Sequence, residues 1–197
     1  VEWAASDQSG KVLDLATGSG DVAFALRRGL PAETSIVGAD FCPPMLDQAR
    51  RKCERLGLDS QSNQFLEEDC LNLSFDDDSF DLVTIAFGLR NLSDRARGLK
   101  EMRRVLKPGG KLIVLEFSQP SFWFRPFYYL YLRGVLPWLA WVLTGDRKAY
   151  LYLGSSISSF PDRDSLSSEL EEAGFAKVRS QGMTFSVVAL HEGLKPD

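Results

Sequence analysis

A glycine-rich turn near the start of the chain constrains the fold more than any other feature. The apolar run of residues 11–16 stops at this turn, Thr17-Gly18-Ser19-Gly20, and a helix is predicted from about Asp21 to Arg28. A second apolar run, residues 34–39, follows and ends at Asp40. A strand, a tight turn, a helix and a second strand, in this order, are typical of a βαβ unit. The first forty residues therefore predict an open, parallel α/β sheet.

The alternation of helices and strands continues to residue 117. The predicted elements are a helix from Pro43 to Leu56, strands over 63–67 and 81–87, a helix over 94–106 and a strand over 111–117. Lys107-Pro108-Gly109-Gly110 is predicted to be the turn before the last of these strands. This pattern indicates a sheet with helices on both faces.

The end of the chain predicts one further helix and two strands. Asp164 is expected to cap a helix that runs through Ala173. Strands are predicted near residues 176–180 and 184–191, with Gly182 in the link between them. Because this link is short, the two strands must pair antiparallel.

Composition excludes several classes of function. The formal net charge is −4, and an acidic chain without a basic stripe does not suit nucleic acid. Cys42, Cys53 and Cys70 form no C-x-x-C pair and His191 is the only histidine, so no metal site is expected. These cysteines suit a reducing, intracellular compartment. No signal peptide is visible and the first residue is not Met, so we expect the sequence to begin partway into a longer protein.

The glycine turn and Asp40 together predict a site for an adenosine-bearing cofactor. Gly18 and Gly20 let a ligand approach the backbone, because neither residue has a Cβ atom. Asp40 stands at the end of the second strand, where its carboxylate can accept hydrogen bonds from ribose hydroxyls. Ligands of open α/β sheets lie beyond the carboxyl ends of the strands, where both features are expected.

The turn by itself fits both NAD and S-adenosylmethionine. A carboxylate at a helix N-terminus competes with a pyrophosphate for the positive end of the helix dipole. S-adenosylmethionine has no phosphate and carries a sulfonium and an ammonium, so Asp14 and Asp21 near the turn favour it. The alternative, that the two carboxylates only form hydrogen bonds within the turn, stays open.

Three further segments carry a resemblance to a known family. They are Phe87-Gly88-Leu89-Arg90-Asn91-Leu92, Leu115-Glu116-Phe117-Ser118-Gln119-Pro120, and Tyr152-Leu153 with Ser156-Ile157 and Phe160-Pro161. With the glycine turn, they make the chain resemble the class I S-adenosylmethionine-dependent methyltransferases. Within these, it resembles the family that C-methylates the ring in menaquinone and ubiquinone biosynthesis. The resemblance implies a Rossmann-like α/β fold with a mostly parallel seven-stranded sheet, an antiparallel last strand and helices on both faces.

The same resemblance implies which residues contact S-adenosylmethionine. Ser19 matches the hydroxyl residue of the family's turn, Asp40 its ribose acid, and Asp69 and Cys70 its adenine-side pair. Ala86 stands where close relatives often have Ser, so a side-chain hydrogen bond is lost there. The full set of expected cofactor contacts is Ala16, Thr17, Gly18, Ser19, Gly20, Asp40, Phe41, Met45, Asp69, Cys70, Ala86 and Phe87.

The implied reaction is methyl transfer to an aromatic carbon of a reduced, prenylated quinol. It requires alignment of the two reactants and stabilisation of the developing phenolate. Arg90 and Asn91 are the expected catalytic residues, because they follow the fourth strand on the ligand edge. A loop salt bridge and a turn hydrogen bond are the alternative roles. Tyr150, Tyr152 and His191 are weaker candidates for a base.

The acceptor is expected to be demethylmenaquinol first and a ubiquinone precursor second. The alternatives are another small-molecule or lipid methyltransferase, an NAD-dependent oxidoreductase, and a protein that keeps the fold without catalysis. The F-G-L-R-N motif disfavours the first of these, and Asp21 disfavours the second.

We expect one domain over residues 1–197, in which 118–161 form a helical insertion on the substrate side. The aromatic residues between Phe122 and Leu143 are interleaved with Arg125 and Arg133. They predict either a cover for the sheet or a face that receives a polyprenyl tail at a membrane interface. A cytoplasmic location is expected, and contact with the inner face of the membrane and a homodimer stay open.

The family usually has some tens of residues before its first strand, and they help to cover the pocket. Here only about ten residues precede the first strand, so the resemblance implies weak retention of the cofactor and low activity.

Overall fold

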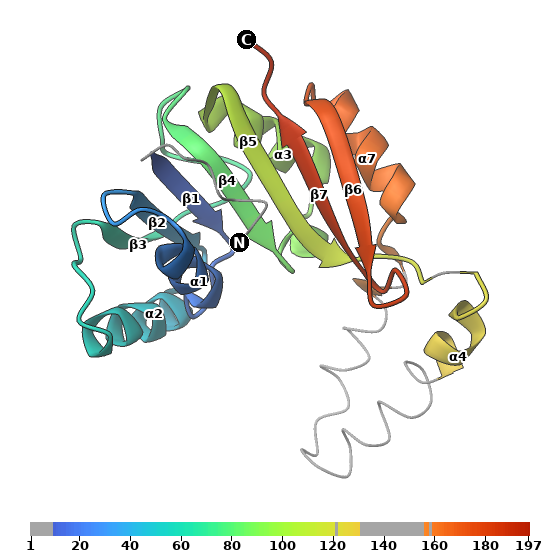
Figure 1. Cartoon of the computed structure of the whole chain (residues 1–197), viewed down its shortest axis with the longest axis horizontal. Helices are drawn as coiled ribbons and strands as arrows, with labels where there is room; N and C mark the ends of the chain where they lie inside the picture. Colours follow the sequence, from blue (N-terminus) through green and yellow to red (C-terminus); the bar gives the residue numbers. More distant parts are fainter. Residues whose placement is uncertain (1–9, 121, 131–155, 158) are drawn as a thin grey trace.

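A seven-stranded sheet forms the centre of the computed structural model, which describes residues 10–120, 122–130, 156–157 and 159–197 (Figure 1). The strands are β1 (Lys11–Leu15), β2 (Ser35–Asp40), β3 (Asn63–Glu67), β4 (Phe80–Ala86), β5 (Leu106–Phe117), β6 (Ala176–Met183) and β7 (Val188–Leu194). Their order across the sheet is β3-β2-β1-β4-β5-β7-β6. Strands β3, β2, β1, β4 and β5 pair in parallel, and β7 is antiparallel to both of its neighbours. The fold class expected from the sequence is therefore confirmed.

Helices cover both faces of this sheet (Figure 1). The covering helices are α1 (Asp21–Gly29), α2 (Pro43–Arg55), α3 (Arg95–Val105) and α7 (Arg163–Glu172). The short helix α4 (Arg125–Leu130) lies beyond the end of the sheet and has no buried residue, and the 3-10 turn η1 (Leu89–Asn91) follows β4. Apolar residues of α1 and α2 pack with Val12, Ile36 and Leu82 in one core. Residues of α3 and α7 pack with Leu13 and Val83 in the other. Because successive strand residues point to opposite faces, these apolar strands bury both of their sides.

The start of β5 differs from the expected turn at residues 107–110. Strand β5 begins at Leu106, which pairs with Phe80, and pairing resumes at Lys111 opposite Leu82. The four residues between them lie opposite the single residue Asp81, as a bulge. Gly109 N donates to the carbonyl of Lys195 at 2.9 Å, so this segment is hydrogen-bonded to the residue that follows β7.

The last helix begins earlier than its expected cap. Asp162, not Asp164, is the N-cap of α7, and its carboxylate accepts a hydrogen bond from Ser165 N at 2.9 Å. Both aspartates are good capping residues by type. Helix α7 begins at Arg163, so Asp164 already lies in its first turn and Asp162 stands at the capping position. Asp94 caps α3 in the same way, by accepting from Arg97 N.

Strand β6 is longer than predicted, β7 begins and ends later than predicted, and residues 184–187 join them. Gly182 was expected in the link, but it pairs with Ala189 inside the ladder. The antiparallel pairing is confirmed. Thr184, Phe185 and Ser186 all have positive φ, so the link turns through left-handed backbone rather than at the glycine.

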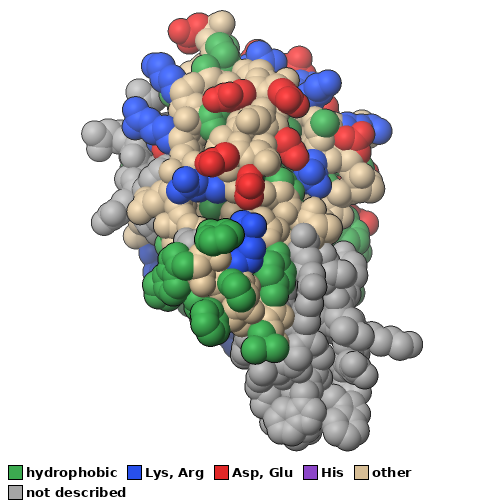
Figure 2. Space-filling model, turned by 90° about the vertical axis from the view of Figure 1, so that its right-hand side faces the viewer, with side chains coloured by type: hydrophobic (Ala, Val, Ile, Leu, Met, Phe, Trp, Pro, Cys, Tyr) green, Lys and Arg blue, Asp and Glu red, His purple; other side chains and the backbone are tan. Residues whose placement is uncertain are grey.

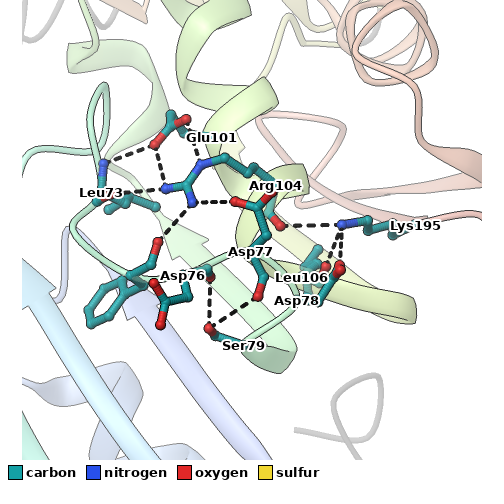
Figure 3. Close-up of polar contacts among 10 residues, drawn as sticks. Leu73, Asp76, Asp77, Asp78, Ser79, Glu101, Arg104, Leu106 and Lys195 are labelled. Carbon is teal, nitrogen blue, oxygen red and sulfur yellow. Dashed lines mark hydrogen bonds and ion pairs between the residues drawn. The ribbon is translucent and has the colours of Figure 1, made fainter.

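A hydrogen-bond network anchors the loop that leads into β4 (Figure 3). The Arg104 guanidinium donates to both carboxylate oxygens of Glu101, to Asp77 and to the carbonyls of Leu73 and Phe75. Lys195 Nζ donates to the Leu106 and Arg104 carbonyls and to Asp78, so it satisfies carbonyl groups at the C-terminus of α3. These contacts hold the start of β4, and through β4 they set the position of the residues that follow it.

Candidate functional site

The expected cofactor residues come together where β1, β2, β3 and β4 end. Gly18 N donates to Asp40 Oδ2 at 2.8 Å, and Cys42 N donates to Asp40 Oδ1 at 3.0 Å. Thr17 N donates to the carbonyl of Ala39 at 3.0 Å. Asp40 thus joins the turn after β1 to the start of α2, and its side chain is buried. A carboxylate oxygen can accept more than one hydrogen bond, so Asp40 retains capacity for hydroxyl donors of a ligand.

Strained backbone stands at the carboxyl ends of β1 and β4. Ala16 and Phe87 have φ of 50° and 54°, a region that residues with a Cβ seldom occupy. The two positions lie side by side, because a Cβ built on Gly88 would come within 2.4 Å of Ala16 Cβ. Only glycine fits at residue 88, and the segment after β4 therefore packs directly on the glycine turn.

The two glycines of the turn have different surroundings. Gly18 has φ of 54°, and a Cβ there would meet only Met45 Cε, at 3.4 Å. A Cβ on Gly20 would lie 2.8 Å from Phe24 and 3.1 Å from Phe65. Gly18 is therefore the position where a ligand can approach the backbone. At Gly20 the missing side chain serves the packing of α1 instead.

Asp14 lies beneath the turn, in the middle of the sheet. Its two carboxylate oxygens accept hydrogen bonds from the hydroxyls of Thr17 and Thr84, each at 2.6 Å, and its side chain is almost fully buried. Burial raises the pKa of Asp14 to about 6, although the two hydroxyls oppose the rise and nearby Asp40 adds to it. Asp14 therefore stabilises the turn through hydrogen bonds within the protein. This is the alternative role that the sequence had left open.

Asp21 is also engaged within the protein. Lys52 Nζ donates to Asp21 Oδ1 at 2.9 Å and to Ser19 Oγ at 3.0 Å, and Ser19 Oγ donates to Asp21 Oδ2. The hydrogen bonds from Lys52 and Ser19 hold the pKa of Asp21 below its usual value. Lys52 offsets the negative charge of Asp21 at the start of this helix. Asp21 is therefore weaker evidence for a cofactor with a sulfonium than its position in the sequence implied.

The residues expected on the adenine side differ in exposure. Asp69 and Phe41 are exposed, and Asp69 Oδ1 accepts a hydrogen bond from Leu71 N at 2.8 Å. Cys70 is buried, and burial, helped by the charges of Asp69 and Asp40, raises the pKa of its thiol to about 11. The thiol is therefore neutral near pH 7, and a contact from Cys70 would be apolar.

An apolar cavity of about 310 Å³ begins beside Ala86. Its lining comes from α1, β4, β5 and β7 and consists of Asp21, Val22, Ala25, Leu26, Thr84, Ile85, Ala86, Ile113, Leu115 and Leu190. Asp40 and Asp69 are not among these residues, so the cavity extends away from the ribose and adenine side. It belongs to the part of the site nearest the ends of β4 and β5.

Arg90 and Asn91 lie in η1, directly after β4. The Arg90 guanidinium is mostly buried, and NH1 donates to Glu116 Oε1 at 2.8 Å and to the carbonyl of Phe87. The salt bridge that the sequence had left as an alternative is therefore present. Asn91 is exposed, and its backbone N donates to the carbonyl of Gly88 at 3.0 Å.

Of the weaker base candidates, the structure describes His191, and it lies away from this edge. His191 is buried in β7, and its Nε2 lies 2.9 Å from the carbonyl of Arg163, at the start of α7. Burial lowers the pKa of His191, so the imidazole is neutral in the folded protein at pH 7. Tyr150 and Tyr152 lie outside the described residues.

Sequence reasoning assigned no role to Lys52, Thr84 or Glu116. Glu116 had a detectable signal, because a lone carboxylate interrupts the apolar run Leu112–Phe117. Lys52 and Thr84 had none, since a lysine on a helix surface and a threonine in a strand are ordinary.

Comparison with known proteins gives consistent matches over nearly the whole chain. The model of the ubiE/COQ5 methyltransferase family matches residues 1–195. Demethylmenaquinone methyltransferase of Thermus thermophilus is 46% identical over 197 residues, which are 100% of this chain and 87% of the relative. The ubiquinone/menaquinone biosynthesis C-methyltransferase UbiE of Idiomarina loihiensis is 43% identical, over 94% of this chain and 74% of the relative.

Solved structures agree on the fold at low sequence identity. A putative methyltransferase from Bacillus halodurans superposes with a TM-score of 0.70 at 20% identity, covering 100% of this chain and 96% of its own. Phosphoethanolamine N-methyltransferase 2 of Haemonchus contortus, in complex with S-adenosyl-L-methionine, has a TM-score of 0.73 at 14% identity, over 100% of this chain and 51% of its own. The similarity supports the Rossmann-like methyltransferase fold.

Replacing Asp14 by asparagine should change how stability depends on pH. The folded-state pKa of about 6 lies above the ordinary value of 3.8, so the ionised carboxylate destabilises the native state above that pH. The cost disappears as the pH falls through the interval between these values, because both states then become protonated. Asparagine keeps the shape, and a threonine hydroxyl can turn to accept from its amide.

The Asp14→Asn variant should be more stable than the wild type by up to about 3 kcal/mol near pH ~8, and the difference should fall below about 1 kcal/mol near pH ~4. Urea unfolding of both proteins across this range measures it. Groups elsewhere titrate in both proteins and cancel in the difference. A gap that does not vary with pH would contradict the raised pKa of Asp14.

Proposed function

The chain belongs to the ubiE/COQ5 methyltransferase family, and from that premise we propose that it transfers the methyl group of S-adenosylmethionine to a ring carbon of a prenylated quinol. The observation that carries the proposal is the 46% identity to a demethylmenaquinone methyltransferase over all 197 residues. Demethylmenaquinol is the first acceptor that we propose. A ubiquinone precursor is the second, because other relatives are named for both pathways.

The residues of the site fit S-adenosylmethionine. Gly18 offers an open backbone position, Asp40 has remaining acceptor capacity for ribose hydroxyls, and exposed Asp69 can accept from an adenine amino group. We propose that the cofactor contacts the turn at 16–20, Asp40, Phe41, Met45, Asp69, Cys70, Ala86 and Phe87. When bound, the cofactor supplies an electrophilic methyl group on a sulfonium.

The chain's own residues then have two tasks, namely to align the acceptor ring and to stabilise the charge that develops on it. We propose Arg90 and Asn91 for the acceptor side, because η1 follows β4 and its neighbour Gly88 packs on Ala16 of the glycine turn. The Arg90 guanidinium is a fixed cation near the end of β4. Its positive charge would stabilise the phenolate that forms when a quinol hydroxyl loses its proton. The apolar cavity beside Ala86 suits an uncharged ring or its substituents.

Gln119 joins the two ends of the segment proposed as a substrate-side insertion, residues 118–161. Its Nε2 donates to the carbonyl of Phe160 at 2.9 Å, and Tyr129 donates its hydroxyl to Gln119 Oε1. We propose that this segment is part of a single domain spanning 1–197. Of the aromatic stretch from Phe122 to Leu143, residues 131–143 lie outside the described residues.

An exposed apolar patch lies on α4 and on the link between β6 and β7 (Figure 2). Trp123 and Phe124 contact Phe185, with ring centroids 5.4 and 5.1 Å apart, so the two segments form one patch. The exposed members are Phe122, Trp123, Phe127, Leu130, Met183 and Phe185. Within the described ranges, no helix has both the length and the apolar character needed to cross a bilayer. We propose that the patch contacts the cytoplasmic surface of a membrane, where a prenylated quinol is found.

The proposed activity is tested by methyl transfer from S-adenosylmethionine to demethylated naphthoquinols and benzoquinols under reducing conditions. The reduced ring should be methylated on carbon, and the oxidised quinone should not, because its ring carbon is not nucleophilic. Mass spectrometry identifies the product. Transfer to an unrelated phenol or lipid without turnover of any quinol would favour the alternative methyltransferase. A larger thermal shift with NAD than with S-adenosylhomocysteine would favour an oxidoreductase.

Replacing Asp40 by asparagine should weaken cofactor binding by about tenfold to a hundredfold, since a charged hydrogen-bond acceptor is lost. Calorimetry with S-adenosylhomocysteine measures the change. Asp47→Asn on the exposed surface of α2 is the matched control and should leave the affinity unchanged. An Asp40→Asn protein that folds and retains its affinity would remove Asp40 from the ribose site.

Replacing Trp123 and Phe185 by serine should reduce binding to anionic phospholipid vesicles by about tenfold or more, because two buried aromatic contacts with lipid are lost. Co-sedimentation measures the bound fraction. Leu56→Ser is the control, since Leu56 and Phe185 are both 57% exposed and Leu56 lies away from the patch, directly after α2. Equal binding by the variant and the wild type would contradict a role for the patch.

A further inference from the structure

Glu116 is a buried carboxylate that no part of the proposed function yet uses. It lies near the end of β5 with 1% of its side chain exposed. Its Oε1 accepts from Arg90 NH1 at 2.8 Å and from Phe117 N at 2.9 Å, and its Oε2 accepts from Arg90 N at 3.2 Å. One carboxylate thus holds both the backbone and the side chain of Arg90.

The surroundings of Glu116 fit a carboxylate and not an amide. Each contact is made by an N–H donor, so a glutamine amide would place donor against donor at one of its two atoms. A buried charge is tolerated when it is paired and hydrogen-bonded, and Arg90 supplies the opposite charge. Arg90 in turn depends on Glu116, because its side chain is only 13% exposed and its Nε is buried without a partner.

Contacts of Arg90 continue from Glu116 to the glycine turn. The guanidinium lies 5.1 Å from the centre of the Phe117 ring, and that ring lies 5.0 Å from the ring of Phe87. Arg90 NH1 also donates to the carbonyl of Phe87, the residue with left-handed backbone. The next residue, Gly88, packs against Ala16. The Glu116–Arg90 pair therefore holds the segment 87–91 between the end of β5 and the turn.

We propose that Glu116 is a positioning residue for methyl transfer. It acts through Arg90, by holding the guanidinium and the segment 87–91 in one arrangement against the acceptor side of the site. This role rests on the proposed function. Most of the proposed cofactor contacts lie in the turn after β1 and at Asp40, and the hydrogen-bond partners of Glu116 are Arg90 and Phe117, so we expect the effect of Glu116 on turnover and on the acceptor.

The first test is Glu116→Gln, assayed with demethylated naphthoquinol under reducing conditions. We expect kcat to fall about tenfold or more and the KM for the quinol to rise, since misalignment affects the reaction step. The Kd for S-adenosylhomocysteine should stay within about threefold of the wild type, because Phe87 is the one proposed cofactor contact within segment 87–91 and the glycine turn, Asp40 and Asp69 are unchanged. Glu192→Gln is the matched control, because Glu192 lies in neighbouring β7 and pairs with Lys111 at 3.7 Å; its kcat should not change.

Two further variants separate positioning from a purely structural role. Glu116→Asp keeps the charge, so it should recover part of the lost kcat. The double variant Arg90→Met with Glu116→Leu replaces the buried pair by apolar side chains, which often restores stability. It should melt near the wild-type temperature and remain slow. This variant keeps the test decisive if Glu116→Gln does not fold.

Three results would overturn the role of Glu116. They are a folded Glu116→Gln protein with wild-type kcat, a double variant that recovers both stability and turnover, and a loss of cofactor affinity that matches the loss of kcat. A wild-type protein that binds S-adenosylhomocysteine and methylates no quinol overturns the proposed function, and this role with it. Turnover by the wild type and by Glu116→Gln alike overturns only the role of Glu116.

Discussion

The contact of Asp40 with the backbone of Gly18 and Cys42 is the interaction on which the candidate site depends. A single carboxylate at the end of β2 sets the shape of the glycine turn and the start of α2. Without it, two N–H groups near a helix start and a tight turn would lose their partner. The same carboxylate is proposed to receive the ribose, so the group that shapes the loops also faces the ligand. Because Asp40 has both roles, an acidic residue at the end of the second strand is a strong sequence signal for a site that binds an adenosine-bearing cofactor.

Two other buried carboxylates lie on opposite faces of the sheet and are stabilised in different ways. Asp14 faces α1 and α2 and its hydroxyl and backbone partners are neutral, so burial raises its pKa. Glu116 faces α3 and α7 and is paired with a guanidinium and backbone N–H groups. The first supports the turn that is proposed to hold the cofactor, and the second holds the segment proposed for the acceptor. Both halves of the candidate site are therefore supported from within the sheet.

The sheet also holds the strained backbone at the carboxyl ends of β1 and β4. Ala16 and Phe87 have left-handed backbone at the ends of adjacent strands, and such conformations persist where the surrounding contacts hold them. At the opposite end of β4, Arg104 and Lys195 fix the loop that leads into the strand (Figure 3). A strand held at its start can impose an unfavourable conformation at its end, and that conformation brings Gly88 against Ala16.

The sequence by itself determined the order of strands and helices, the parallel sheet and the edge at which the cofactor residues gather. Hydrophobic period, glycine, proline and capping residues act locally, and they are legible without the fold. Only the tertiary structure decided that residues 107–110 form a bulge in β5 and that Asp21 pairs with Lys52. It also decided that Arg90 is bound to Glu116, 26 residues further along the chain. The local sequence determines whether a residue lies in a helix, a strand or a turn. The partner of a charged side chain depends instead on which strands and helices become neighbours in space.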